Sequence, residues 1–238
     1  MSDASPIAVN RLLAALPDAE YQRLIPHLNN VSISLKQVLH EVGEPIEYVY
    51  FPQNAMVSAL TTMVDGAMVE VGLVGYDGVT GIPAALGDNI AATNGIVQAA
   101  GSGMRMKASV LKTEFERGGL LQSLLLRYIQ AQHAFVTQNA ACNRLHYLEM
   151  RLARWLLLAC DRIGSNELPM THEFMSYMLG VRRAGVTEAA NALKQSGLIR
   201  YTKGKVTILN RQELEAASCE CYEIIKGEYA RLLGTDKG

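Results

Sequence analysis

The stretch that decides the fold of this chain is THEFMSYMLGVRRAGVTEAANALKQSGLIR, residues 171–200. Thr171 is suited to cap a short amphipathic helix, and Gly180 can take the left-handed conformation that ends it. A second helix is predicted over residues 182–196, with Gly197 as its stop. Two helices joined by a tight glycine turn indicate a helix-turn-helix unit.

The second of these helices has two different faces. At about 100° per residue, Val186, Ala189 and Leu193 fall together and are expected to pack inward. A polar stripe about 80° wide faces the other way and consists of Arg183, Thr187, Asn191 and Lys194, with Glu188 at its border. Small residues beside an arginine at a helix N-terminus suit close approach to a major groove. We therefore predict that Arg183 contacts base edges and that Arg182 contacts phosphate.

A basic hairpin is predicted directly after the second helix, because LIRYT and KVTIL flank Lys203-Gly204. Helix, turn, helix and hairpin together make a winged helix-turn-helix. An ordinary α/β subdomain with a solvated basic face is the alternative, but the coincidence of these features favours DNA binding. The predicted DNA-contacting residues are Thr171, His172, Arg182, Arg183, Thr187, Glu188, Asn191, Lys194, Tyr201, Lys203 and Lys205.

Charge is distributed unevenly along the 238 residues, although the net charge is only −1. Residues 37–104 contain seven acidic residues and neither Lys nor Arg. Residues 180–211 contain seven basic residues against Glu188 alone. This asymmetry indicates that only the second part of the chain meets a polyanion.

The first half has the texture of an antiparallel β-roll. Short apolar segments between about residues 31 and 110 are separated by Gly, Asp, Asn and Pro. Asp65-Gly66 predicts a two-residue hairpin turn, and the alternation that follows places Glu70 outward. Before the roll, residues 10–30 are predicted to be helical, with Asn10 as a cap and Pro17 ending the first run.

A long helix is predicted between the two halves, since residues 120–146 contain neither Gly nor Pro. A spacing of four and three residues marks one face, which we predict to be a dimer surface. The alternative is that this helix packs on its own roll. The predicted dimer-helix residues are Leu121, Leu125, Tyr128 and Phe135.

The order of these parts resembles the Crp/Fnr family of bacterial transcription regulators. The matching segments are EYVYFPQNAMVSALTTMVDGAMVEVGLVGYDGVTGI, EMRLARWLLLAC and the stretch quoted first. The resemblance implies an α+β fold with a jelly-roll-like N-terminal antiparallel β-roll, a long dimerisation helix and a C-terminal winged helix-turn-helix. The expected domains are a cyclic-nucleotide-binding-like sensory roll at 1–118, the dimerisation helix at 119–146 and the DNA-binding domain at 147–238. The resemblance also implies a homodimer that binds a palindromic operator.

The chain departs from the cyclic-AMP-type members of that family at several positions. Arg183 matches a base-reading arginine, but Ala184 and Glu188 stand where those members have a glutamate and an arginine, so a different operator is expected. The phosphate cassette is also absent, because Ile82 replaces its glutamate and GIPAALGDNIAATNGIVQAA contains no arginine. We therefore expect neither cyclic AMP nor cyclic GMP as the effector. The effector pocket is predicted at Gly75, Tyr76, Thr93, Asn94 and Thr137.

Other chemistry has weaker support in the sequence. The N-terminal cysteines of iron–sulfur oxygen sensors are missing, since the first cysteine is Cys142. Cys219 and Cys221 are predicted to lie on one helix that begins after Asn210, about 200° apart, which argues against a shared metal. A redox switch or a packing role remains open for this pair. No catalytic constellation stands out, so we predict no enzyme activity, no metal and no cofactor.

These observations predict a cytoplasmic, homodimeric, sequence-specific DNA-binding regulator with an unidentified small-molecule effector. Neither a signal peptide nor a membrane span is recognised. RNA polymerase is a candidate partner. One alternative is a regulator that binds a cyclic nucleotide through unfamiliar contacts, and the other is a small-molecule-binding or interaction module that no longer reads DNA.

Overall fold

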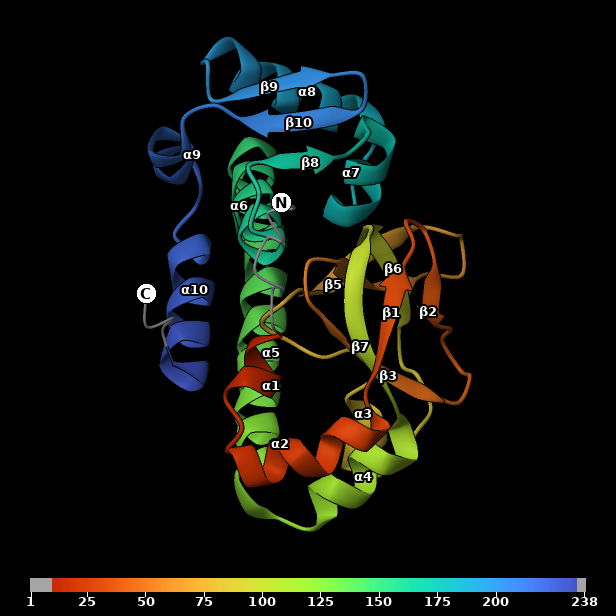
Figure 1. Cartoon of the computed structure of the whole chain (residues 1–238). Helices are drawn as coiled ribbons and strands as arrows, with labels where there is room; N and C mark the ends of the chain where they lie inside the picture. The colour runs from red at the N-terminus through yellow and green to blue at the C-terminus, as the bar shows by residue number, and fades with distance from the viewer. Residues whose placement is uncertain (1–9, 235–238) are drawn as a thin grey trace, which may run out of the picture. The chain divides into compact units, whose positions relative to one another are not determined.

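The computed structural model describes residues 10–234 (Figure 1). The chain divides into two compact units. The first unit contains the residues up to 59 together with 73–129, and the second contains 60–72 together with the residues from 130 onward. The long helix α5, Gly119–Leu145, contributes to both units, as does the hairpin of strands β4 and β5.

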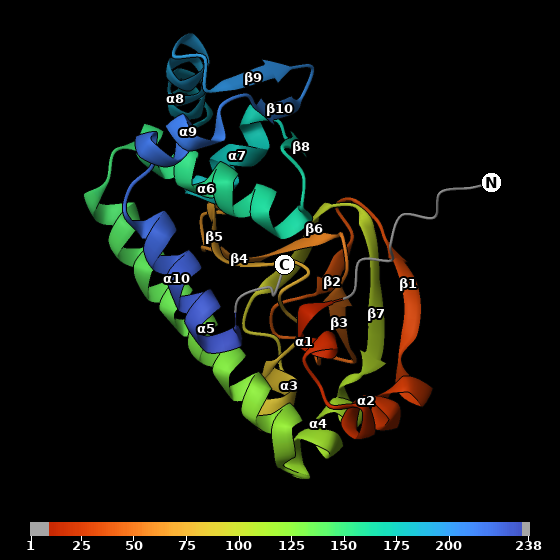
Figure 2. The same ribbon diagram turned by 60° about the vertical axis from the view of Figure 1, so that its left-hand side comes forward.

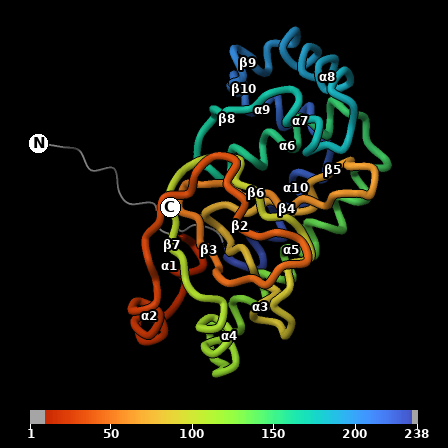
Figure 3. Tube along the Cα trace, turned by 90° about the vertical axis from the view of Figure 1, so that its right-hand side faces the viewer, coloured from red at the N-terminus to blue at the C-terminus, as the bar shows by residue number. Residues whose placement is uncertain are grey.

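The first unit is built around a β-roll, as predicted. Its strands are β1 (Asn29–Ile33), β2 (Val38–His40), β3 (Tyr48–Pro52), β4 (Met56–Thr62), β5 (Met68–Val74), β6 (Asn94–Ala99) and β7 (Gly101–Lys107). One sheet has the order β1-β7-β3 and the other β2-β6-β4-β5. Strand β7 runs antiparallel to both of its neighbours, β1 and β3. Figure 3 follows the chain through this roll. Buried Ile33, Tyr50, Val57 and Val97 form a hydrophobic cluster in this roll.

The remaining elements of the first unit are short helices and the start of α5. They are α1 (Arg11–Ala14), α2 (Asp18–Leu24), the 3-10 helix Ile25–His27, α3 (Pro83–Leu86) and α4 (Ala108–Glu116). The predicted cap at Asn10 is confirmed, because its side-chain oxygen accepts hydrogen bonds from the backbone N–H groups of Leu12 and Leu13 at 3.1 and 3.3 Å. Pro17 separates the first two helices as expected, since it is the N-cap of α2.

The β4–β5 hairpin forms as predicted, but its turn is longer than the two residues expected. Met63 N donates to Ala67 O at 2.8 Å, so three residues form the loop, and Gly66 takes the left-handed conformation with φ 84°. The orientation expected for Glu70 is wrong, because this side chain is 2% exposed. Trp155 Nε1 donates to its Oε1 at 2.8 Å, which satisfies a carboxylate that strand alternation alone would place in solvent.

The second unit joins helices to a small antiparallel sheet. Its elements, besides the end of α5, are α6 (Leu148–Ile163), β8 (Glu167–Pro169), α7 (His172–Leu179), α8 (Arg183–Gln195), β9 (Ile199–Thr202), β10 (Lys205–Ile208), α9 (Arg211–Ala217) and α10 (Cys221–Leu233). The sheet order is β8-β10-β9. The mixed helical and antiparallel-strand fold class predicted from the sequence is thus confirmed. None of the described helices is long and apolar enough to cross a bilayer.

The face of α5 that was predicted to be a dimer surface is buried within the chain. Leu121, Leu125, Tyr128 and Phe135 are at most 3% exposed, so they lie on the face that is buried within the chain. The helix instead exposes apolar side chains on another face, including Leu126 at 49% and Val136 at 43%. A helical period identifies an apolar face but cannot tell whether the same chain or a second chain covers it.

Candidate nucleic-acid interface

The helix-turn-helix is formed by α7 and α8. Thr171 Oγ1 accepts the hydrogen bond of Phe174 N at 3.1 Å and caps α7. Gly180 ends that helix with φ 61°, and Val181 N returns to Ser176 O at 3.0 Å. Helix α8 follows with Arg182 as its N-cap residue, and its inner face buries Val186, Ala189, Ala190 and Leu193. The predicted inward and outward faces of α8 are therefore confirmed.

The outer face of α8 presents cations that no group in the described part of the chain neutralises. Arg183, Glu188, Asn191 and Lys194 are exposed, as is Arg182 just before the helix. Within residues 10–234, the side chains of Arg182, Arg183 and Lys194 have no hydrogen-bond or ion-pair partner. The first two add their charge where the helix dipole is already positive. Together they produce a positive field at the end of α8 that points to solvent.

His172 ties the two helices to the hairpin that follows them. Its Nδ1 lies 3.0 Å from Thr187 Oγ1 on α8. Its ring stacks on Tyr201 of β9, with centroids 4.2 Å apart and planes at 27°. The Thr187 hydroxyl donates to Arg183 O at 3.0 Å, so it accepts from His172 Nδ1–H. Partial burial, together with the charge of Arg183, lowers the pKa of His172, which favours the neutral imidazole.

The wing is the hairpin of β9 and β10. Lys203 and Gly204 both have positive φ, 49° and 76°, as a primed two-residue turn requires. Thr202 pairs with Lys205 across the turn, so the predicted tight hairpin with Lys203 at its exposed tip is confirmed. Lys205, however, forms an ion pair with Glu167 on β8. Its charge is partly neutralised within the sheet.

Residues 150–217 match the sequence profile of the Crp-like helix-turn-helix domain. The chain contains a Crp-like helix-turn-helix domain. A comparison with curated protein sequences finds no match. The match to the helix-turn-helix profile spans α6, α7, α8, the three-stranded sheet and α9, which include the elements described above.

Several solved structures share the fold at low sequence identity. FixK2 from Bradyrhizobium japonicum is 17% identical with a TM-score of 0.69, covering 81% of this chain and 98% of that one. A CRP-family transcriptional regulator from Thermus thermophilus, TTHB099, is 19% identical with a TM-score of 0.64 over 79% and 96%. The c-di-GMP-responsive global regulator CLP from Xanthomonas campestris is 12% identical with a TM-score of 0.59 over 82% and 100%. The chain is therefore Crp/Fnr-like in fold.

The predicted effector residues of this Crp/Fnr-like chain do not line the described cavity of its first unit. That cavity, of about 490 Å³, is lined among others by Glu47, Tyr48, Lys107 and Lys112. Asn94 Oδ1 accepts from Val42 N at 3.0 Å, and the carbonyl of Tyr76 accepts from Arg11 N at 2.7 Å. Gly75 and Thr93 also belong to this unit.

Thr137 is the one predicted effector residue assigned to the second unit, where its hydroxyl donates to His133 O at 2.8 Å within α5. In the first unit, α5 packs against the glycine-rich loop GYDGVTG, residues 75–81. A Cβ at Gly78 would lie 2.5 Å from the Tyr128 hydroxyl, which donates to Val79 O at 3.1 Å. These contacts fill the surroundings of the loop with an aromatic side chain.

The expectation that Cys219 and Cys221 point apart is wrong. Helix α9 starts after the predicted Asn210 cap but ends at Ala217, and α10 begins at Cys221. Because Cys219 lies in this break, the 100° rule does not apply to the pair. Both thiols lie beside Cys142 and His146 instead. Two local features of the sequence could have indicated this cluster: the four-residue spacing of Cys142 and His146, and the two-residue spacing of Cys219 and Cys221.

Proposed function

We propose that the chain is a homodimeric, sequence-specific DNA-binding transcription regulator whose β-roll responds to an effector. The observation that carries the proposal is the exposed positive charge on α8 and at the wing tip, which has no ion-pair partner within residues 10–234 and belongs to a Crp-like helix-turn-helix. Of the seven basic residues between 180 and 211, Lys205 and Arg211 form ion pairs with acidic residues. The other five are exposed to solvent: Arg182, Arg183, Lys194, Arg200 and Lys203.

The positions of these cations support different roles for them in DNA binding. Arg183 stands in the first turn of α8, where the small, exposed Ala184 beside it leaves room for a base pair to approach. A bidentate contact from such an arginine to guanine would give sequence discrimination. Arg182 and Lys203 lie at the helix start and the wing tip, where phosphate contacts fix the register without reading sequence. His172, Thr187 and Tyr201 hold the two helices and the wing together.

Homodimerisation is proposed through the exposed face of α5. Leu126 and Val136 are apolar side chains on that face, and about half of each is exposed to solvent. A single helix-turn-helix offers few contacts, whereas a two-fold dimer binds two half-sites one helical turn apart. The palindromic operator expected from the sequence follows from that symmetry. RNA polymerase is a further candidate partner of such a regulator.

The effector is proposed to be neither cyclic AMP nor cyclic GMP. A buried cyclic phosphate needs cations or several aimed N–H groups, because it loses its hydration. Residues 37–104 contain neither Lys nor Arg, and Tyr128 covers the glycine-rich loop at Gly78. Calorimetric titration is expected to show no saturable binding at micromolar nucleotide. A one-to-one isotherm in that range would favour the cyclic-nucleotide alternative.

Selection of bound duplexes from a random pool tests the DNA-binding proposal directly. The full chain should enrich a palindromic consensus with half-sites about one helical turn apart. An Arg183→Ala chain should lose preference at one base pair of each half-site. Arg231→Ala is the matched control, since Arg231 is an exposed arginine on α10 that pairs with Glu228. The absence of any enrichment by the unmodified chain would instead support the module that no longer reads DNA.

A further inference from the structure

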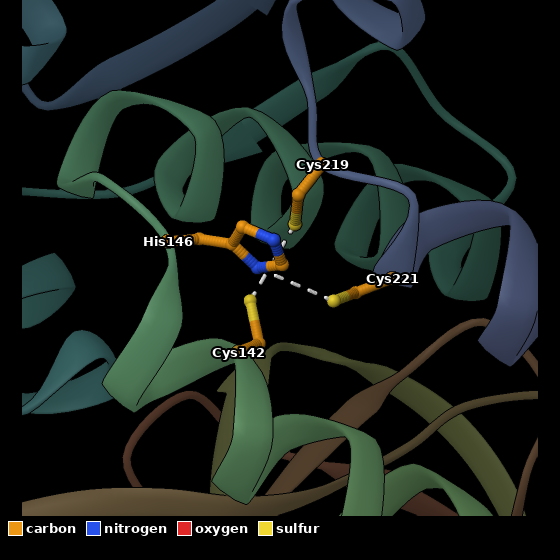
Figure 4. A group of neighbouring side chains, drawn as sticks. All are labelled: Cys142, His146, Cys219 and Cys221. Atoms are coloured by element: carbon orange, nitrogen blue, oxygen red, sulfur yellow. Dashed lines mark hydrogen bonds between the residues drawn. The ribbon is translucent and has the colours of Figure 1, made fainter.

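Three thiols and an imidazole converge in the second unit (Figure 4). The ligand atoms of Cys142, His146, Cys219 and Cys221 all lie within 4.8 Å of one another. Cys142 Sγ is 3.5 Å from Cys219 Sγ, and Cys221 Sγ is 3.5 Å from His146 Nδ1. The three cysteines are buried and the histidine is half-buried. All four contribute atoms that bind transition metals.

Two separate segments supply these groups. Cys142 and His146 are one turn apart at the end of α5, and His146 N donates to Cys142 O at 3.1 Å, so their side chains share one side of that turn. The other two come from the break between α9 and α10, where Ser218 is extended and Tyr222 N returns to Cys219 O at 3.1 Å. This break starts α10 next to the C-terminal end of α5 (Figure 2).

The spacing fits one tetrahedral ion. Zinc lies about 2.3 Å from thiolate sulfur and about 2.0–2.1 Å from imidazole nitrogen, which makes the sulfur–sulfur edge of a tetrahedron about 3.8 Å and the sulfur–nitrogen edge about 3.5 Å. The observed separations of 3.5 Å and 3.5 Å are close to those edges. A cluster of several irons would hold its ligands farther apart. We propose that Cys142, His146 through Nδ1, Cys219 and Cys221 bind a single zinc-class divalent ion.

Neighbouring groups orient the ligands as metal sites require. His146 Nε2 lies 3.2 Å from Glu220 Oε2, so Nε2 carries a proton that it donates to the carboxylate. That tautomer leaves the lone pair of Nδ1 directed toward the thiols. Gln138 Nε2 donates to Cys221 Sγ at 3.1 Å. Carboxylate–histidine–metal chains and hydrogen bonds to ligand sulfurs of this kind set both geometry and affinity.

Charge in the surroundings also suits a bound ion. One divalent ion with three thiolates and a neutral imidazole has a net charge of −1. Arg151 and Arg154 on α6 are buried, at 8% and 2% exposure. Within the described chain, each donates to an oxygen of an uncharged group, Leu179 O and Asn139 Oδ1, and the Nε of each has no hydrogen-bond partner. Buried guanidinium groups without a carboxylate partner are costly. An anionic metal site would offset that cost, because both guanidinium groups interact electrostatically with the Cys142 and Cys219 side chains.

A disulfide between Cys142 and Cys219 is the competing use of this cluster. It would involve two of the four groups and would leave the orientation of His146 by Glu220 without a role. The ion uses all four ligands, and it would fix the segment that follows the winged helix to the end of α5. The site does not depend on DNA binding, so it can be tested without an operator.

Metal content and spectroscopy test the site on the full chain, purified under reducing conditions without a histidine tag. Elemental analysis should find about one zinc per chain after dialysis. Replacing it with Co²⁺ should produce thiolate-to-cobalt charge-transfer bands and the strong visible bands of tetrahedral cobalt. X-ray absorption of the zinc form should show three sulfurs at about 2.3 Å and one nitrogen at about 2.0–2.1 Å. A reduced chain that holds no zinc and gives no cobalt spectrum would overturn the proposal.

Variants separate the site from general stability. Cys142→Ala and Cys219→Ala should lose the bound ion, whereas Cys160→Ala, which removes a buried cysteine outside the cluster, should keep it. Glu220→Gln changes an exposed side chain, so the chain should fold while its zinc affinity falls about 10- to 100-fold. Unchanged zinc affinity in Glu220→Gln and in Cys219→Ala, or a Cys142–Cys219 disulfide in place of the ion, would contradict the assignment.

Discussion

The α8 face and the cysteine cluster lie in the same compact unit but come together in different ways. The α8 face is assembled from neighbours in the sequence, within residues 171–205, and its cations are exposed. The cluster joins Cys142 to Cys219, 77 positions away, and its thiols are buried. Local periodicity is enough to find the first kind of site. The second depends on where a helix breaks, which periodicity does not reveal.

The two sites should also respond to different conditions. Contacts from exposed cations to phosphate weaken with salt, because binding releases condensed counterions. A buried ion held by thiolates is insensitive to salt but is lost to a chelator or to a change of one ligand. The following predictions use this contrast to test whether the two sites are as independent as their geometry indicates.

The largest effect is expected from metal removal. A chain saturated with zinc at a thousand times its dissociation constant should be more stable than the chelated chain by about 4 kcal/mol, since the ion binds only the folded state. Denaturant unfolding with and without chelator measures this difference. Cys219→Ala should abolish it, and Cys160→Ala should preserve it. Equal stability of the two forms in the unmodified chain would show that the cluster is not a structural metal site.

A charge on the exposed face of α5 should have the next largest effect. Val136→Asp is expected to give a folded monomer whose operator affinity falls by about 100-fold or more, because one half-site is lost. Val136→Thr keeps the size without the charge and should remain dimeric. Sedimentation together with DNA titration measures both properties. Phe135→Asp should unfold the chain instead, as Phe135 is 1% exposed. A tight-binding wild-type monomer would contradict the proposed dimer.

The sequence predicted the elements of this fold better than the environment of single residues. The winged helix-turn-helix, the antiparallel roll and the caps at Asn10, Thr171 and Asn210 follow from local chemistry, and the structure confirms them. Glu70 was misplaced because a tryptophan 85 positions away supplies its partner. The 4-3 spacing of α5 predicts a dimer surface at Leu121, Leu125, Tyr128 and Phe135, but the same chain buries these side chains. Each of these errors concerns contacts between residues distant in sequence.

Loss of the side chain of Arg183 should weaken DNA binding moderately without changing folding stability. Arg183→Ala is expected to cost about 1–3 kcal/mol per half-site and to relax the preference at one base pair. Folding stability should change little, since the exposed guanidinium has no hydrogen-bond or ion-pair partner within residues 10–234. Competition titration against single-base variants of the operator measures the change. Arg231→Ala should leave both affinity and preference unaltered, whereas equal effects of the two substitutions would remove Arg183 from the reading face.

The smallest effect distinguishes two lysines of the wing. Lys203 is exposed at the tip of the turn and has no ion-pair partner within residues 10–234, whereas Lys205 is paired with Glu167 on the neighbouring strand. Lys203→Ala should therefore weaken binding to all sequences alike and reduce the slope of log affinity against log salt by about one per lost phosphate contact. Lys205→Ala should change that slope less, because the charge of Lys205 is already partly neutralised by Glu167. Glu167→Gln should make the slope steeper, because it leaves Lys205 available to contact phosphate. Titrations at several salt concentrations give all three slopes. A larger loss of slope for Lys205→Ala than for Lys203→Ala would mean that Lys205 leaves Glu167 for phosphate when DNA binds.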